Sequence, residues 1–362
     1  MAQTDPAPDK PVHTLTKEGL LTDSWYLAAR SVELKRGGQM RRLILGEPVM
    51  LGRTREGKAF ALRDVCPHRR VPLSAGRQVE TEGEATVECP YHGWRFGTDG
   101  VCRLLPSLTD DTPYEASRIR VRRYPVHEAS GAVFIHVHHD PRETEPPALA
   151  PPDFGAMPDR PKLSWQRALD VPMDEAVTRL ASPERTPLVQ AWGLWRAQPG
   201  RGGRDRLRLV ARERGWAMTA SPVLGRPGGA IGLFPGKAQL DILFQLPGFR
   251  WEILESSGAR LVALTGLTPE TPCRTHLTQL VWWAGAPQLN LVRAKLKATA
   301  RRQVDTAQGR ETGRTDAAET MLLENAGMAA GWYERLKSQG SAGRLRDAGP
   351  GDEGEPVQPP RS

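Results

Sequence analysis

Short stretches in which apolar and polar residues alternate occupy the first part of the chain, and turns rich in glycine and proline separate them. Arg42 to Met50, Lys58 to Val65 and Ala132 to His138 are the clearest of these stretches. Successive side chains of a strand point to opposite faces, so alternation is the pattern of a half-buried strand. The first part of the chain is therefore predicted to be an all-β domain.

A second series of strand-like stretches follows, and helical patterns come after it. Gln288 to Thr306 and Asp316 to Lys337 carry apolar residues at helical spacing, which predicts long helices packed across the second sheet. The fold class is therefore predicted as α+β. The strands expected in this part are Leu163 to Leu169, Arg206 to Ala211, Leu240 to Leu246, Arg250 to Leu254, Arg260 to Thr265 and His276 to Trp283.

Composition divides the chain into domains. Seven prolines lie between Pro141 and Pro161, and such a stretch forms neither a central strand nor a continuous helix. The end of the chain is rich in Gly, Pro and charge and has almost nothing to bury, which favours disorder. The expected division is a flexible tail at 1–20, a first domain at 21–140, a linker at 141–162, a second domain at 163–337 and a disordered tail at 338–362.

Charge and cysteine content narrow the class of protein. No stretch approaches the roughly 18 apolar residues that a membrane span requires, and no signal peptide is visible. The chain has 4 cysteines, too few for a disulfide scaffold, so we expect a cytoplasmic protein without membrane contact. Its net charge of +8 comes from dispersed arginines without interleaved aromatic residues. This favours a solvated surface over nucleic-acid binding, with docking of an acidic electron donor as an alternative.

Two short loops of the first domain carry the candidate metal ligands. Cys66 and His68 lie in CPHRR, and Cys89 and His92 lie in CPYHGWRF. Each loop offers one Cys and one His, so each can give one ligand to each iron of a 2Fe-2S cluster. Thiolates suit the iron that stays ferric, and neutral imidazoles on the other iron raise the reduction potential. A structural Cys2His2 zinc site is the alternative, but zinc knuckles place two cysteines close together in one loop, which neither loop does.

These loops resemble the Rieske domain in the oxygenase component of Rieske non-haem iron oxygenases. Trp25, Tyr26 and the segments Leu45 to Val49 and Pro72 to Gly76 also match the family's pattern. The resemblance covers roughly residues 20 to 140. It implies a 2Fe-2S cluster held by both loops. The stretch between the two loops is longer than the family usually has, and we expect the extra residues to form a hairpin near Glu80 to Ala85.

The resemblance also indicates the electron source. Rieske proteins of respiratory complexes add a cysteine to each loop and a serine that hydrogen-bonds the cluster, whereas Tyr91 and Trp94 stand at such places here. Fewer donors to the cluster imply a lower reduction potential. The resemblance therefore implies a ferredoxin or a flavin-dependent reductase as the electron donor.

In the second domain, the family has a helix-grip (START-like) sheet with a helix motif N-x-x-D-x-x-H-x4-H and a late carboxylate, which together hold a mononuclear iron. Aligning Asp174 with the motif aspartate places Val177 and Ser182 where the family has histidines. Of the 8 histidines in the chain, His276 is the only one after residue 139, and Asp305 matches the late carboxylate. A carboxylate alone cannot hold ferrous iron. Mononuclear Fe(II) is therefore not expected in this chain.

The altered segment is predicted to be an ordinary packing helix. Met173, Val177 and Leu180 form one apolar stripe, and Pro183 discourages helical geometry at Ser182. Asp174 keeps two interpretations: an acidic group favouring the helix N-terminus, or the residue that in the family bridges a cluster histidine of one subunit to the iron site of the next.

The leading hypothesis is a Rieske-type oxidoreductase subunit that delivers electrons to the mononuclear iron of a related catalytic subunit. The family's head-to-tail rings imply a ring-shaped homo- or hetero-oligomer. One alternative is a ligand-binding or assembly protein with a structural or regulatory cluster. Another is a self-sufficient oxygenase whose unusual iron site recruits His276 with Asp174 or Asp305.

Four further residues are expected to have no role in chemistry. His136 and His138 fall on one face of a strand end and are predicted to face solvent rather than to bind metal. Cys102 and Cys273 are predicted to be small buried side chains, because neither has a second Cys or a His nearby in the sequence.

Overall fold

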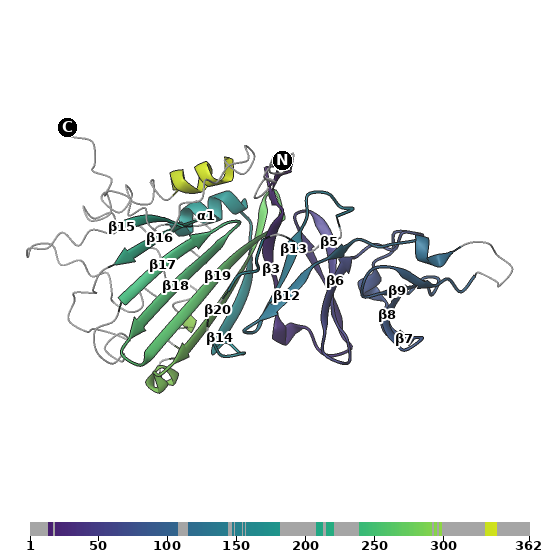
Figure 1. Ribbon diagram of the computed structural model, residues 1–362, viewed down its shortest axis with the longest axis horizontal. Helices are drawn as coiled ribbons and strands as arrows, with labels where there is room; N and C mark the ends of the chain where they lie inside the picture. The colour runs from purple at the N-terminus through teal and green to yellow at the C-terminus, as the bar shows by residue number, and fades with distance from the viewer. Residues whose placement is uncertain are drawn as a thin grey trace, which may run out of the picture.

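The computed structural model shows two β domains side by side, with the smaller sheets of the first domain on the right of Figure 1 and one large sheet on the left. It describes residues 14–16, 19–107, 115–143, 147, 149–153, 155, 157–181, 208–212, 215–220, 239–291, 293–294, 297–298 and 330–338. No helix in these ranges is long and apolar enough to cross a membrane. The α+β fold class is confirmed.

Within the described residues, the first domain consists of short antiparallel strands. They form sheets in the orders β1-β2, β10-β9-β8-β7, β11-β6-β5-β4 and β12-β13-β3. The strands are β1 Thr14–Leu15, β2 Leu21–Thr22, β3 Ser24–Arg30, β4 Gln39–Ile44, β5 Glu47–Arg53, β6 Ala59–Arg63, β7 Arg77–Thr81, β8 Glu84–Glu88, β9 Arg95–Gly97, β10 Cys102–Leu104, β11 Arg123–Tyr124, β12 Val126–Ala129 and β13 Ala132–Val137. Short 3-10 helices lie at η1 Ser31–Glu33, η2 Leu73–Ala75 and η3 Ala116–Arg118.

The second domain is a seven-stranded antiparallel sheet in the order β14-β20-β19-β18-β17-β16-β15. Helix α1, Met173–Ala181, packs on this sheet, and a second helix at residues 330–338 lies against α1. The strands are β14 Leu163–Leu169, β15 Arg208–Arg212, β16 Gly215–Ala220, β17 Gln239–Gln245, β18 Phe249–Ser256, β19 Ala259–Thr271 and β20 Arg274–Ala284, followed by the 3-10 helix η6 Pro287–Asn290.

The two domains meet where β3 packs on β19. The hydroxyl of Thr268 donates to the carbonyl of Leu27 over 2.9 Å. Gly266 lies opposite Leu27, and a Cβ atom at this glycine would stand 2.7 Å from the Leu27 Cδ2 atom, so a larger residue would push the strands apart. The turn between β4 and β5 also bonds to β19, because the Leu45 amide donates to the Pro269 carbonyl over 2.8 Å. One continuous apolar core therefore crosses the junction.

Several predicted elements differ from the observed ones. The single strand expected at Arg42 to Met50 is a hairpin, because Leu45 and Gly46 have φ of 52° and 77° and turn the chain. Strand β16 was not predicted, and β19 extends well beyond the expected Arg260 to Thr265. The hairpin expected near Glu80 to Ala85 is present as β7 and β8.

The long C-terminal helices fall largely outside the described residues. The first expected range, 288–306, is described only at η6 and at residues 290–291, 293–294 and 297–298, of which the last two pairs are helical. The second, 316–337, is described from residue 330, where it is helical to residue 338. Both expected terminal tails lie mostly outside the described residues.

Candidate functional site

The first candidate loop, residues 64–76, connects β6 to β7 and is closed by backbone hydrogen bonds. The Cys66 amide donates to the Val71 carbonyl over 2.9 Å, and the Arg70 amide donates to the Cys66 carbonyl over 2.8 Å. The buried carboxylate of Asp64 accepts from the amide and the hydroxyl of Ser74, each over 2.6 Å. Asp64 was missed from the sequence, although an acidic residue directly after a buried strand and two positions before Cys66 is a usable signal.

The second loop, residues 89–94, connects β8 to β9 in the same way. The Cys89 amide donates to the Trp94 carbonyl over 2.8 Å, and the Gly93 amide donates to the Cys89 carbonyl over 3.1 Å. Gly93 has a φ of 70°, which a side chain would strain. Both loops thus form tight turns that bring one Cys and one His to the same end of the first domain.

The four candidate ligands divide into a buried pair and an exposed pair. Cys66 and Cys89 are 1% and 3% exposed and pack in an apolar cluster with residues such as Leu73 and Phe96. His68 and His92 are exposed, and their ring centroids lie 4.7 Å apart. The thiols therefore face the core, and the imidazoles form the outer edge of the site.

The protonation states of Cys66 and His68 depend on their surroundings. Burial raises the pKa of the Cys66 thiol to about 11, and the adjacent Cys89 thiol adds to the effect. A metal must therefore displace a firmly held proton before this thiol can act as a ligand. Partial desolvation and the positive charges of His92 and Arg69 lower the pKa of His68, which favours the neutral imidazole that binds metals.

Two aromatic side chains hold the imidazoles. The Trp94 indole is parallel to the His68 ring, with 2° between the planes and 4.7 Å between the centroids. The Tyr91 ring lies 4.0 Å from the His92 ring, at 36°. Stacking of this kind fixes the orientation of an exposed ring that would otherwise rotate.

The donor set fits a two-iron cluster better than a zinc ion. The two buried thiols and the two exposed imidazoles form separate pairs. A tetrahedral zinc site needs four such ligands around one point. Each iron of a Rieske cluster takes only two protein ligands, and bridging sulfides complete its coordination.

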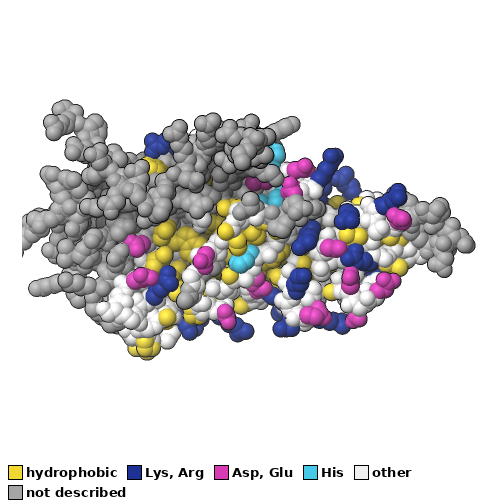
Figure 2. All heavy atoms as spheres, viewed as in Figure 1, with side chains coloured by type: hydrophobic (Ala, Val, Ile, Leu, Met, Phe, Trp, Pro, Cys, Tyr) yellow, Lys and Arg dark blue, Asp and Glu magenta, His cyan; other side chains and the backbone are white. Residues whose placement is uncertain are grey.

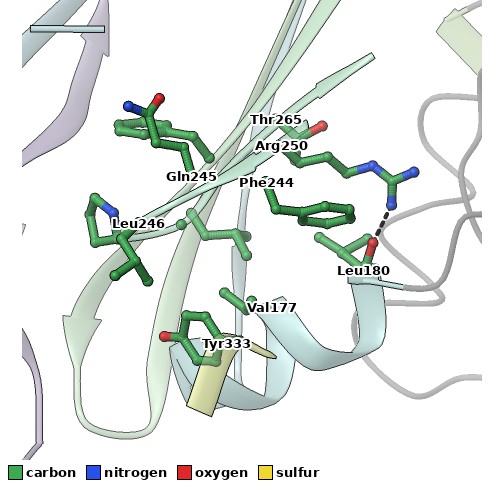
Figure 3. A pocket seen from close by; sticks show the side chains of 12 residues that line it. Val177, Leu180, Phe244, Gln245, Leu246, Arg250, Thr265 and Tyr333 are labelled. Atoms are coloured by element: carbon green, nitrogen blue, oxygen red, sulfur yellow. Dashed lines mark hydrogen bonds between the residues drawn. The ribbon is translucent and has the colours of Figure 1, made fainter. Parts of the chain in front are cut away.

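The inner face of helix α1 borders a small apolar pocket of about 20 Å³ that is partly open to solvent (Figure 3). Val177 and Leu180 of α1, together with Tyr333, line this pocket on the side opposite Phe244 of the sheet. Val177 is buried in the core. The pocket is lined by Val177, Leu180, Phe244, Gln245, Leu246, Pro247, Gly248, Phe249, Arg250, Thr265, Leu267 and Tyr333. Ser182 and Asp305 lie outside the described residues.

Asp174 is engaged by the helix at residues 330–338. Its carboxylate accepts a hydrogen bond from the Tyr333 hydroxyl over 2.7 Å and pairs with the Lys337 ammonium group. Burial and the Asp174 charge raise the pKa of Tyr333 well above its usual value, so this hydroxyl stays protonated and donates. No local sequence pattern indicates these two partners, because they lie more than a hundred residues away along the chain.

His276 faces away from the pocket. It neighbours Leu277, which pairs with the pocket residue Leu267, so alternation places His276 on the opposite face of the sheet. There it lies 3.2 Å from Glu270, and burial together with the Arg42 charge lowers its pKa. The geometry therefore does not bring His276 and Asp174 into one metal site.

Three of the four residues expected to have no chemical role differ from their predicted exposure. His136 and His138 are 2% and 8% exposed, so the expected solvent-facing strand end is wrong. Trp25 covers His136, with ring centroids 5.3 Å apart. Cys102 is buried as expected, but Cys273 is exposed in the turn between β19 and β20.

Comparison with known proteins identifies the family of the first domain. Residues 24–125 match the family described as the Rieske 2Fe-2S domain. The oxygenase subunit of 3-chlorobenzoate-3,4-dioxygenase from Comamonas testosteroni is 39% identical over 120 residues, covering 33% of this chain and 27% of that protein. The oxygenase component of dicamba O-demethylase from Stenotrophomonas maltophilia is 36% identical over 137 residues, covering 38% of this chain and 37% of that protein. The match thus spans only about a third of these relatives.

The likeness in structure extends further than the likeness in sequence. The crystal structure of dicamba monooxygenase bound to dicamba superposes with a TM-score of 0.61 and covers 88% of this chain and 98% of that chain, at 24% identity. At this identity the similarity concerns the fold. The second domain therefore shares its architecture with that protein.

Proposed function

Because residues 24–125 belong to the Rieske 2Fe-2S domain family and 88% of the chain superposes on dicamba monooxygenase, we propose that the protein is an electron-transfer subunit of a Rieske oxygenase system. Cys66, His68, Cys89 and His92 hold a 2Fe-2S cluster. A ferredoxin or flavin-dependent reductase supplies the electrons, and they pass to the mononuclear iron of a related catalytic subunit in a ring-shaped oligomer.

The loops provide what such a cluster requires. When bound, the cluster supplies a one-electron redox couple. The Cys66 and Cys89 sulfurs lie in an apolar, water-poor environment, while the His68 and His92 imidazoles reach the surface. The parallel Trp94 ring keeps His68 in a fixed orientation. Electrons therefore have their shortest route to another protein through the imidazole edge.

The observation that carries the electron-transfer role is the environment of Val177. An apolar side chain cannot bind iron, and Val177 packs with Leu180 and Tyr333 in the pocket wall. The relatives named above are oxygenase components, and this chain keeps their fold with a rebuilt helix surface. Oxidation of a substrate therefore depends on a subunit that has an intact iron site.

The arrangement of the chain supports transfer between subunits. The ligand loops lie at the outer end of the first domain, near β7 to β9, whereas α1 and the pocket lie beyond the domain junction on the left of Figure 1. A cluster at that end faces away from its own second domain. An electron leaving the imidazole edge thus reaches another chain more readily than the pocket of its own.

Metal counting and spectroscopy test the proposal. We expect about two irons and two acid-labile sulfides per chain, with a Rieske-type EPR signal after dithionite reduction and no substrate oxidation by the protein alone. Addition of a catalytic oxygenase subunit should then allow turnover. A third, mononuclear iron, or turnover by the purified chain alone, would show that it is a self-sufficient oxygenase.

The pocket favours one second candidate, an apolar-ligand-binding protein in which the cluster is structural or regulatory. Half of its lining residues are Leu, Phe or Val, and the Arg250 guanidinium lies at one side. Native mass spectrometry of the purified protein separates the two functions. A bound apolar compound, together with failure to reduce any catalytic subunit, would favour the second candidate.

A further inference from the structure

The first domain buries one carboxylate among the residues that the structure describes, that of Asp64. This residue is 1% exposed, whereas other acidic and basic side chains are interspersed over the visible surface of the domain (Figure 2). Burying a carboxylate is costly unless hydrogen bonds replace its contacts with water. Asp64 meets this condition inside the first ligand loop, two residues before Cys66.

Asp64 ties the two ends of the first ligand loop, residues 64–76, to each other and to the sheet. Its Oδ1 atom accepts from the Ser74 amide and its Oδ2 atom accepts from the Ser74 hydroxyl, each over 2.6 Å. Its own amide donates to the Pro48 carbonyl of β5 over 2.8 Å. A single side chain therefore closes a loop that carries one Cys and one His between its ends.

Strand β4 holds the same end of the loop through Gln39. The Gln39 side-chain amide donates to the Gly76 carbonyl over 2.9 Å and lies 3.2 Å from the carbonyls of Leu73 and Ser74. We call Gln39, Asp64 and Ser74 together the loop clasp. The clasp fixes residues 73–76 by hydrogen bonds from β4 and from the start of the loop.

The loop clasp also reaches the second ligand loop. A Cβ atom at Gly76 would stand 1.9 Å from the carbonyl oxygen of Glu88, the residue before Cys89, so the two segments are in close contact. Leu73 is fully buried and packs in the apolar cluster that contains Cys66 and Cys89. The position of residues 73–76 thus determines how the two thiols are placed relative to each other.

We propose that Asp64 is a positioning residue for the cluster. Through the loop clasp it holds Cys66 and His68 in place relative to the second ligand loop, and its negative charge lowers the reduction potential of the cluster. A buried negative charge close to a redox centre disfavours the added electron, since the interior screens charge weakly. Arg41, 3.7 Å from the carboxylate, is 53% exposed and therefore offsets this charge only in part. The proposal rests on the proposed function, because it requires a bound cluster.

Release of iron tests the positioning role. The oxidised holoprotein is mixed with EDTA, and the loss of the visible absorption of the cluster gives the release rate. Ser74→Ala removes the hydroxyl donor but keeps the backbone amide, and it should release iron about tenfold faster than the wild type because one hydrogen bond to a charged group is lost. Ser74→Thr keeps the hydroxyl and should release iron at the wild-type rate.

The reduction potential tests the effect of the charge. Asp64→Asn keeps the shape of the side chain and removes its charge, so the potential in a redox titration should shift upward. Ser74→Ala leaves the carboxylate charged and should shift the potential less. A residue that only packs the loop would leave the potential unchanged.

Asp99→Asn provides the matched control. Asp99 lies in the turn between β9 and β10, where it accepts from the Val101 amide over 3.0 Å and from the Arg103 guanidinium over 2.8 Å. The same change of charge is thus made at a carboxylate that also holds a turn of the first domain, but outside both ligand loops. The release rate and the potential of this variant should equal those of the wild type.

Two results would overturn the proposal. The first is equal iron release from Ser74→Ala, Ser74→Thr and Asp99→Asn, and this comparison decides the positioning role even if Asp64→Asn takes up no cluster. The second is a potential of Asp64→Asn equal to that of the wild type. Failure of the proposed function is distinct, because a wild-type protein without two irons and a Rieske EPR signal fails before any variant is compared.

Discussion

The ligand loops lie in the first domain and helix α1 lies in the second, on the two sides of the domain junction, and the two regions differ in character (Figure 1). In the loops, Cys66 and Cys89 are buried, yet His68 and His92 reach the surface, so donor atoms remain available. In α1, the inner face presents the buried apolar side chain of Val177, which has no donor atom. The loops thus present donor atoms of the kind that bind metal, whereas the inner face of α1 presents apolar packing. Four predictions separate these two regions.

Removal of one buried thiol should have the largest effect. Cys66→Ala leaves one iron with a single thiolate ligand, so we expect loss of nearly all iron and of the EPR signal. Iron analysis of the purified variant measures this. Cys102→Ala is the matched control, because Cys102 is buried in the same apolar cluster but is no candidate ligand. Equal iron loss in both variants would mean that packing, not ligation, explains the effect.

A histidine restored to α1 should destabilise the protein rather than create an iron site. Val177→His buries an imidazole in an apolar wall, which costs roughly 1–3 kcal/mol of the free energy of unfolding. Thr178→His is the control, since Thr178 is exposed on the same helix. Urea unfolding and iron counting measure both quantities. A stable Val177→His variant with a third iron would show that the iron site is nearly intact.

The role of Asp174 can be assigned by measuring stability and electron transfer separately. Asp174→Asn weakens the contacts to Tyr333 and Lys337, and because the side chain is 43% exposed we expect a loss of only about 1 kcal/mol in the free energy of unfolding. Glu175→Gln, which removes an exposed pair on the same helix turn, should cost less than about 0.5 kcal/mol. Electron delivery to a catalytic subunit should be unchanged. A large drop in that rate with normal stability would instead identify Asp174 as a bridge between subunits.

The smallest expected effect concerns His276 and pH. Burial lowers the pKa of this histidine in the folded protein, so the unfolded chain binds the proton more tightly. Its neutral form is compatible with full stability above the unfolded pKa of about 6.5, and stability falls as the pH drops below that value. His276→Gln should therefore lose less Tm than the wild type between pH 7 and pH 5.5. If the Tm of both proteins fell equally over this pH range, Glu270 would be stabilising the protonated His276.

Local patterns predicted strands well where both ends were marked by turns. Leu163–Leu169 was predicted with the bounds that the structure shows for β14. The prediction of a single strand at Arg42 to Met50 was wrong because Leu45 adopts a positive φ. An apolar residue does not indicate such a turn in the sequence. Strand β16 was not predicted from the sequence. Its pairing with β15 and β17, rather than an alternation of apolar and polar residues, places it in the sheet.

Exposure was predicted less well than secondary structure. His136 and His138 looked like the polar end of an edge strand, but Trp25 of β3 covers the face on which His136 lies. Cys273 looked like a buried hydrophobe, yet it lies in a tight turn between two long strands. In each case the deciding contacts come from residues distant in the chain.

The sequence alone determined the donor set of the candidate cluster, because ligand type and spacing within a short loop are local properties. It also determined that His276 is the only histidine after residue 139, since residue identity needs no fold. Tertiary structure decided which donors are buried, which face of the sheet His276 occupies, and that Tyr333 and Lys337 engage Asp174. These features depend on strand register and helix packing between distant segments, and no local pattern encodes them.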